Sequence, residues 1–165
     1  MSISRQNLSI VIVTFKSEDV IHQCIRSINN EIDIIVIENS DNEKFREELE
    51  TKYSNVKCYI SKKNLGMGAG NNLGIAYAKT DYVFLLNPDV IFDNSMIDSM
   101  ILDSKKIPSF VVLSPLSSNA NYPNYKLIDD KKNMTKNNEP FEVKSVDGFA
   151  MLLNKKKIEK LISTK

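Results

Sequence analysis

The sequence predicts an α/β protein in which a mostly parallel sheet lies between two layers of helices. The chain has five short runs rich in valine, isoleucine and leucine. In most of them the apolar residues follow one another without alternating polar residues, which is typical of parallel strands buried on both faces. Helical patterns lie between these runs, and a strand–helix alternation of this kind implies right-handed crossovers. The predicted strands are Leu8–Thr14, Ile32–Glu38, Val56–Ile60, Tyr82–Leu86 and Phe110–Leu113.

Four predicted helices lie between these strands. In Asp19–Asn29, apolar residues recur at steps of three and four, as in a helix with one buried face. Ser40 is followed three residues later by Glu43, and this capping-box pattern predicts the start of a charged helix that runs to about Tyr53. The last two helices are predicted at 71–79 and 94–104.

Residues 114–140 form a different kind of segment. They hold three of the five prolines, many asparagines and serines, and few aliphatic residues, so we expect a long loop. A loop of this length in a compact domain is usually a functional flap or partly disordered. A short apolar stretch, Phe149–Leu153, and a lysine-rich helix are expected to follow it.

Composition excludes several classes of protein. With 22 Lys+Arg against 21 Asp+Glu, the net charge of +1 argues against a nucleic-acid partner, which needs a concentrated cationic face. Cys24 and Cys58 lie among apolar neighbours, which favours two buried thiols in a reducing compartment over a disulfide. The apolar runs are too short for a signal peptide or a spanning helix, so we expect a cytoplasmic protein. Residues 126–165 carry 10 basic against 6 acidic residues, which predicts a solvated face or a contact with an anionic membrane.

Polar residues follow four of the predicted strands. In an open parallel sheet, ligands bind beyond the carboxyl ends of the strands. Small hydroxyl and amide side chains at four consecutive strand ends indicate a ligand with many donors and acceptors, such as a nucleotide. These segments are Thr14–Glu18, Glu38–Ser40, Asn64–Asn72 and Asn87–Asp89.

The glycines at 66, 68 and 70 are candidates for a phosphate-binding turn, because glycine lets backbone N–H groups approach a ligand closely. A dinucleotide-binding fingerprint is excluded by spacing, because its third glycine would fall on Asn71 or Leu73. There is no Walker lysine–serine pair either. The alternative is that these glycines only let a helix pack against the sheet.

Three carboxylates at strand ends are candidate ligand contacts. Asp89 follows a buried strand behind a stiffening proline, where one carboxylate can hold a divalent cation that bridges a diphosphate. The alternative is that Asp89 caps the next helix. Glu38 and Glu18 can accept hydrogen bonds from a ribose hydroxyl or a base imide, although Glu18 can equally be a helix N-terminal charge. A single histidine, and no cysteine pair at ligand spacing, argue against a zinc site.

Four motifs, in this order along the chain, resemble those of a known family. Together they resemble the inverting family-two glycosyltransferases with a GT-A fold, and Asn-Pro-Asp-Val is most similar to rhamnosyltransferase-like members that build bacterial surface polysaccharides. The segment Val146–Leu153 is similar to the acceptor-side segment of the family. The four motifs are Leu8–Phe15, Ile35–Ser40, Asn64–Gly74 and Leu85–Val90.

The resemblance implies a nucleoside-diphosphate sugar as donor, linked to dTDP or UDP, and a glycan or lipid-linked acceptor. It implies that Thr14, Phe15 and Glu18 line the base pocket. Base or ribose would then contact Glu38 and Asn39. Residues along the ribose and diphosphate would be Asn64, Gly66 and Asn71. The metal motif would hold Asn87 and Asp89, with Asp89 as the carboxylate that binds Mg²⁺ or Mn²⁺.

The chain departs from the family pattern at three points. Glu38 and Asn87 stand where the family usually has aspartate, and the Glu-Asp stretch that supplies the general base of the family does not occur before Lys165. A general base must lie within hydrogen-bond reach of the acceptor hydroxyl, and Asp147 is the only nearby candidate.

We therefore expect a single GT-A-like domain over 1–165 that is incomplete at its C-terminal end. It would consist of a nucleotide-sugar-binding part (1–113), the loop (114–140) and the start of the acceptor-side part (141–165). The expected function is glycosyl transfer in surface polysaccharide synthesis, at the inner face of the membrane. The alternatives are a non-catalytic nucleotide-sugar-binding fragment or half of a split enzyme, and an unrelated nucleotide-binding α/β domain. An exposed apolar face would be covered by a second copy or a partner chain.

Overall fold

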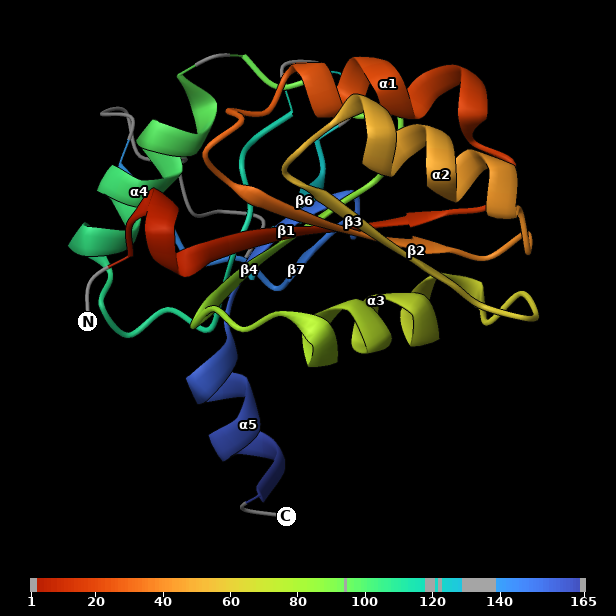
Figure 1. Cartoon of the computed structure of the whole chain (residues 1–165). Coiled ribbons are helices and arrows are strands. Elements are labelled where there is room, and N and C mark those ends of the chain that lie inside the picture. Colours follow the sequence, from red (N-terminus) through yellow and green to blue (C-terminus); the bar gives the residue numbers. More distant parts are fainter. Residues whose placement is uncertain (1–2, 94, 118–120, 122, 129–138, 164–165) are drawn as a thin grey trace.

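The fold is known from a computed structural model that describes residues 3–93, 95–117, 121, 123–128 and 139–163, with the backbone alone for 160–163. Its centre is a six-stranded sheet with the order β3-β2-β1-β4-β8-β5 (Figure 1). These strands are β1 (Leu8–Thr14), β2 (Asp33–Glu38), β3 (Val56–Ile60), β4 (Tyr82–Leu86), β5 (Val112–Leu113) and β8 (Ala150–Asn154). The helices are η1 (Arg5–Asn7), α1 (Glu18–Arg26), α2 (Glu43–Lys52), α3 (Gly66–Tyr77), α4 (Met96–Lys106) and α5 (Lys155–Ser163).

The sheet confirms the predicted fold class. Strands β1 to β4 are parallel to one another, and β8 runs antiparallel to both β4 and β5. Helices α1, α2 and α4 pack on one face, whereas α3 covers the other face and α5 extends away from it (Figure 1). The three layers predicted from the strand–helix alternation are therefore present.

β1 lies at the centre of the core. Ile10 and Ile12 point to the face covered by α1 and α2, and Val11 points to the face covered by α3. All three side chains have no exposed surface. Burial on both faces explains why this strand has a continuous apolar run, since alternation is expected only where one face meets water.

The start of α3 differs from the prediction. The helix begins at Gly66 and not at Asn71, so the glycines lie in its first turns. A Cβ at Gly70 would lie 2.7 Å from Val13 Cγ1, and a Cβ at Gly74 would lie 2.3 Å from Val11 Cγ1. For these two positions the packing interpretation holds, because their lack of a side chain lets the helix approach β1. Gly66 has a different role, since its φ of +74° is one that glycine adopts readily.

The predicted capping box at Ser40 is wrong. Helix α2 begins at Glu43, and its N-cap is Asn42, whose Oδ1 accepts a hydrogen bond of 3.1 Å from the Phe45 N–H. Ser40 donates from both its N–H and its hydroxyl to the Glu38 carboxylate instead. The local pattern fails because a carboxylate at the end of β2 binds the serine that the pattern assigns to the helix.

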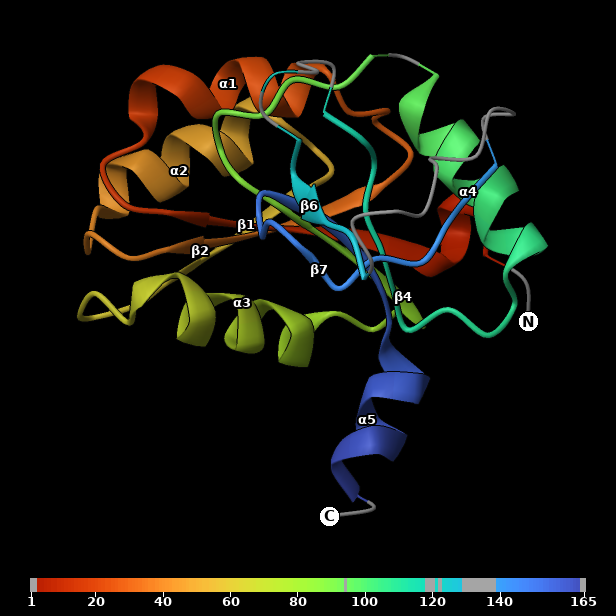
Figure 2. The same cartoon turned by 180° about the vertical axis from the view of Figure 1, so that it is seen from behind.

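The region predicted as a long loop contains one short strand, whose partner lies just after the region. Residues 118–120, 122 and 129–138 of this region lie outside the described part, but β6 (Tyr125–Lys126) pairs antiparallel with β7 (Ser145–Val146) (Figure 2). The fifth predicted strand is also shorter than expected, because the Phe110 N–H bonds to the Ile107 carbonyl in a turn before β5. No helix in the part of the chain that the structure describes is long and apolar enough to cross a membrane.

Candidate functional site

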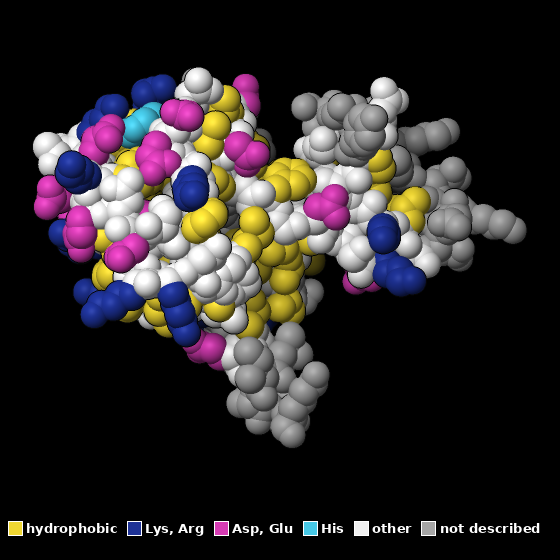
Figure 3. Space-filling view, turned by 90° about the vertical axis from the view of Figure 1, so that its right-hand side faces the viewer, with side chains coloured by type: hydrophobic (Ala, Val, Ile, Leu, Met, Phe, Trp, Pro, Cys, Tyr) yellow, Lys and Arg dark blue, Asp and Glu magenta, His cyan; other side chains and the backbone are white. Residues whose placement is uncertain are grey.

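The candidate site lies at the carboxyl edge of β1 to β4. These strand ends point to the right in Figure 1, and Figure 3 looks directly onto them. Hydrophobic side chains gather in the middle of that view, with acidic and basic side chains around them. Phe15 and Ile91, which follow β1 and β4, have 47% and 60% of their surface exposed.

The end of β1 contributes one buried and two exposed residues. Thr14 is fully buried, and its hydroxyl donates to the Ile37 carbonyl over 3.5 Å. Phe15 and Lys16 are exposed, and the Lys16 ammonium lies 5.6 Å from the centre of the Phe15 ring. Phe15, rather than Thr14, therefore presents side-chain surface at this strand end.

Asn39 connects the end of β2 to β1 and α3. Its N–H donates to the Thr14 carbonyl over 2.9 Å, and its Nδ2 lies 3.5 Å from the Gly66 carbonyl oxygen. Its Oδ1 is the only buried side-chain oxygen or nitrogen of the described residues without a hydrogen-bond partner. A buried polar atom without a partner costs about 1–3 kcal/mol, so a donor supplied by a ligand would be favourable here.

Glu38 is fully buried in this structure, and its carboxylate faces its own loop. Oε1 accepts hydrogen bonds from the Ser40 hydroxyl and from the Ser40 N–H at 2.9 Å, and Oε2 accepts from the Asn42 N–H at 2.8 Å. Contact of Glu38 with a base or ribose stays a prediction.

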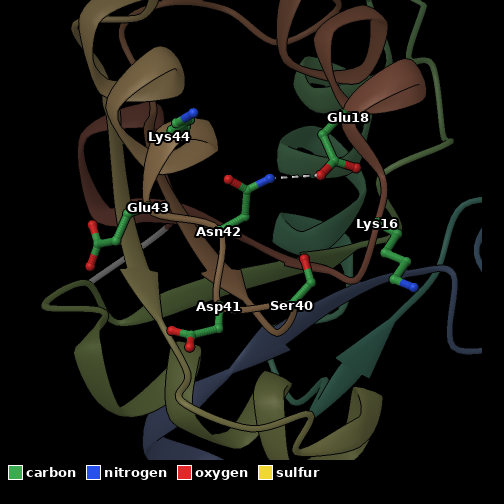
Figure 4. A pocket seen from close by; sticks show the side chains of 7 residues that line it. All are labelled: Lys16, Glu18, Ser40, Asp41, Asn42, Glu43 and Lys44. Carbon is green, nitrogen blue, oxygen red and sulfur yellow. Dashed lines mark hydrogen bonds between the residues drawn. The ribbon is translucent and has the colours of Figure 1, made fainter.

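A shallow pocket of about 450 Å³ lies between the starts of α1 and α2. Glu18 and Asn42 point toward each other in it, and Asn42 Nδ2 donates to Glu18 Oε1 over 3.0 Å (Figure 4). Two of its residues, Lys16 and Asp41, have left-handed backbones with φ of 53° and 58°. The lining residues are Lys16, Glu18, Ser40, Asp41, Asn42, Glu43 and Lys44. Of these, sequence reasoning named Glu18 as a ligand contact, included Lys16 and Ser40 only as members of the polar segments after two strands, and missed the rest.

The first turn of α3 lies beside Asn39. Asn64 Oδ1 accepts from the Gly66 N–H over 2.8 Å, which fixes the entry into the helix. Asn71 lies in the second turn of the helix and is half-buried. The structure therefore brings Asn64 and Gly66 next to the end of β2, and places Asn71 further along the helix.

The end of β4 forms a turn that carries Asp89 on the surface. The Val90 N–H donates to the Asn87 carbonyl over 3.2 Å, and the Asn87 N–H donates to the Phe149 carbonyl over 2.9 Å. Asp147 is exposed, and its N–H donates to the Asn124 carbonyl over 2.8 Å. Because the Phe149 carbonyl is hydrogen-bonded to the Asn87 N–H, the segment that contains Asp147 and Phe149 lies next to the turn that contains Asp89.

The described residues include no group of three or more His, Cys, Asp or Glu side chains that could hold a metal ion by themselves. Mg²⁺ is commonly held by one or two carboxylates together with water and substrate phosphate oxygens. An exposed Asp89 with Asn87 two residues away fits that kind of site, in which the ligand supplies most of the oxygens.

With this geometry established, comparison with known proteins identifies the family. The family model described as glycosyl transferase family 2 matches residues 9–162. The chain belongs to this family.

The chain is also similar to a hexosyltransferase and, in its fold, to two solved structures. The chain is 32% identical over 88 residues to the low-salt glycan biosynthesis hexosyltransferase Agl10 of Haloferax volcanii, covering 51% of this chain and 28% of that protein. Staphylococcus aureus TarS 1–349 in complex with UDP-GlcNAc superimposes with a TM-score of 0.65 at 14% identity, over 94% of this chain and 47% of that one. The mannosyltransferase PcManGT of Pyrobaculum calidifontis, in complex with GDP-Man and Mn²⁺, superimposes with a TM-score of 0.68 at 8% identity, over 96% of this chain and 47% of that one.

These likenesses confirm the GT-A glycosyltransferase fold for the family 2 domain. The chain spans about half the length of the solved structures and 28% of the hexosyltransferase.

Both cysteines of the family 2 domain are buried and free. Burial, together with the Asp89 charge, raises the pKa of the Cys24 thiol from 9.0 to about 12. Burial also raises the pKa of Cys58 to about 12, with a smaller contribution from the charge of Glu38. The Cys24 thiol donates weakly to the Asn87 carbonyl over 3.7 Å.

These thiols predict a loss of stability at alkaline pH. Unfolded thiols lose their protons near pH 9, whereas the folded ones hold them to about pH 12, so the unfolded state binds fewer protons in this window and the free energy of unfolding falls. Urea unfolding at pH 8, 9.5 and 10.5 measures the fall. The double variant Cys24→Ala/Cys58→Ala is the control, and an equally steep fall in it would show that other groups are responsible.

Proposed function

We propose that this chain binds a nucleoside-diphosphate sugar at the carboxyl edge of β1 to β4 and transfers the sugar to a hydroxyl group of a glycan. The observation that carries the proposal is the unpaired Asn39 Oδ1, buried where β1, β2 and α3 meet. Family membership and the hexosyltransferase relative favour transfer over binding alone. The nucleotide sugars in the two solved relatives support the choice of donor.

The nucleoside of the donor contacts the ends of β1 and β2. The exposed Phe15 ring packs against one face of the base, as aromatic side chains do with flat ligands. With a turn of the Asn39 side chain, which is buried in this structure, Oδ1 accepts a hydrogen bond from the imide N–H of the base, for which UDP and dTDP are the candidates. The diphosphate then lies along the first turn of α3, where helix N–H groups favour an anion.

The diphosphate end of the donor reaches the turn after β4. Asp89 and Asn87 would hold Mg²⁺ or Mn²⁺ there with the phosphate oxygens. The bound ion would neutralise negative charge on the leaving diphosphate. The Asp89 carboxylate is exposed and free to turn toward that ligand.

The reaction is an inverting displacement. The acceptor hydroxyl oxygen bonds to the anomeric carbon on the face opposite the diphosphate, the bond from that carbon to the phosphate oxygen breaks, and a base takes the hydroxyl proton. Asp147, exposed in the segment that adjoins the Asp89 turn, is the candidate base. We place this activity in surface polysaccharide synthesis of the rhamnosyltransferase-like type, on a glycan or lipid-linked acceptor at the inner face of the membrane.

Thermal unfolding tests the proposal. UDP, dTDP and GDP are each added with Mn²⁺, and we expect one of them to raise the Tm by roughly 5–10 °C at a hundredfold excess over its Kd, because a ligand of the folded state adds about 2.7 kcal/mol there. In Asn39→Leu the shift is lost while the Tm of the free chain changes little, since the variant removes an unpaired buried oxygen together with the long Nδ2 contact to the Gly66 carbonyl. Failure of all three nucleotides to move the Tm would contradict the proposal.

A further inference from the structure

We infer that Glu38 is a positioning residue: it does not touch the donor, but holds the loop of residues 39–42 in the shape that nucleotide binding requires. The inference rests on the proposed function, since this loop lies at the proposed nucleoside site. It differs from the expectation drawn from the family resemblance, in which Glu38 contacts base or ribose directly.

The Glu38 carboxylate is bound by residues of its own loop. Glu38 has no exposed surface, and its three donors are two N–H groups and one hydroxyl from residues two and four positions further along the chain. Both oxygens are therefore engaged by the loop itself. Hydrogen bonds to a charged acceptor are stronger than neutral ones, which suits a carboxylate that must hold a loop.

The backbone of the loop explains why such an anchor is needed. Asp41 has a left-handed backbone with φ of 58°, a conformation that is uncommon outside glycine although aspartate adopts it more readily than most residues. Its two neighbours, Ser40 and Asn42, are the residues whose N–H groups bind Glu38. The carboxylate thus holds both sides of the residue with the left-handed backbone, and without these bonds the loop could adopt another conformation.

Asn42 transmits the position of the loop to two helices. Its Oδ1 caps α2 by accepting from the Phe45 N–H, and its Nδ2 donates to Glu18 at the start of α1. Because its own N–H is bound to Glu38, the carboxylate sets how far apart the two helix starts stand. These helix starts are the walls of the pocket in Figure 4.

Side-chain chemistry makes the role specific to glutamate. A glutamine at 38 places an NH₂ group where one oxygen now accepts, so a donor would face either the Ser40 donors or the Asn42 N–H. An aspartate is shorter by one methylene and cannot reach both residues. Both variants should therefore loosen the loop without removing any atom that touches the nucleotide.

The experiment measures nucleotide affinity by calorimetry on the full chain. The probe is whichever of UDP, dTDP and GDP binds the unmodified chain most tightly, together with its monophosphate. We expect Glu38→Gln and Glu38→Asp to raise the Kd at least tenfold, by the same factor for both nucleotides, because the loop lies on the nucleoside side. Circular dichroism confirms that each variant is folded at the working temperature.

Glu50→Gln is the matched control. The Glu50 carboxylate also accepts from a backbone N–H, that of Cys58 at 2.9 Å, but it lies on α2 away from the loop. We expect this variant to lower the Tm and to leave the Kd within a factor of two. An equal loss of affinity in Glu50→Gln would overturn the inference, because it would show that general destabilisation explains the result.

Asn42→Ser tests the route from Glu38 to the pocket. Serine is a good N-cap, so α2 keeps its cap while the hydrogen bond to Glu18 is lost. If Glu38 acts through Asn42, the double variant Glu38→Gln/Asn42→Ser binds no more weakly than the weaker single variant. Additive losses would instead indicate direct contact of Glu38 with the nucleotide and overturn the inference. Should Glu38→Gln not fold, the same cycle is run with Glu38→Asp.

Two further outcomes are distinct. An unchanged Kd in both Glu38 variants would overturn the positioning role and leave the proposed function standing. If the unmodified chain binds none of the three nucleotides, the proposed function fails and the inference fails with it.

Discussion

Gly74→Ala is expected to lower the free energy of unfolding by about 3 kcal/mol, the upper end of the usual cost of overpacking a core. The added Cβ would lie 2.3 Å from Val11 Cγ1 and 3.3 Å from Val11 Cβ. Val11 cannot move aside easily, because it is fully buried in the central strand and its branched side chain is stiff. Urea unfolding monitored by circular dichroism measures the change.

Gly68→Ala is the control for this substitution. Gly68 lies in the same helix, but a Cβ there meets no atom within 4 Å. Because alanine favours a helix over glycine by about 0.8–1 kcal/mol, this variant should be as stable as the unmodified chain or more so. The double variant Gly74→Ala/Val11→Ala should recover part of the loss. Equal stability of the two glycine variants would show that α3 does not depend on close contact with β1.

The strands could be predicted from the sequence because their signal is local. Ile10, Val11 and Ile12 are buried on both faces of β1, so the apolar run alone marks the strand. The same holds for β4, all five residues of which are buried. The strand pair β6–β7 could not be predicted, since residues 125–126 pair with residues about 20 positions further along the chain and have no strong apolar pattern.

Helix boundaries at the site were wrong where tertiary contacts decide them. Glycines disfavour a helix, so the sequence places the start of α3 after the glycines at 66, 68 and 70, but the helix begins at Gly66 and the lack of a side chain at Gly70 lets its first turns pack against β1. At α2, Ser40 matches a capping box, yet the buried Glu38 carboxylate takes its hydroxyl and N–H. Neither contact can be read from neighbouring residues in the chain.

The candidate site was selected by a rule of topology, and its ligand contacts stay predictions. Polar residues after parallel strands meet at one edge, and this rule selected Asn39 and Asp89 without any structure. It could not show that Asn39 Oδ1 lacks a partner, nor that Asn42 links two helices, because both facts depend on side-chain geometry. The left-handed backbone of Lys16 could not be predicted either, since it leaves no local signature in a lysine.

The largest functional effect is expected from Asp89→Ala. In the unmodified chain, Mn²⁺ should tighten the binding of a nucleoside diphosphate, and in the variant this gain should disappear, because Asp89 is the one carboxylate of the turn after β4. A bound cation supplies several kcal/mol of charge stabilisation, so sugar transfer should fall at least about 100-fold. Calorimetry with and without Mn²⁺ measures the first effect, and release of nucleoside diphosphate from the donor measures the second.

Two further variants separate charge from shape. Asp89→Asn keeps the size of the side chain and removes its charge, so it should behave like the alanine variant if the carboxylate binds the cation. Asp93→Ala removes another exposed carboxylate, which lies four positions after Asp89 and accepts a hydrogen bond of 2.9 Å from the Ser95 N–H. This variant should leave the Mn²⁺ effect intact. Tightening by Mn²⁺ that survives in Asp89→Ala would place the cation elsewhere, and the turn after β4 would then contribute only the backbone of Asn87 and its bond to Phe149.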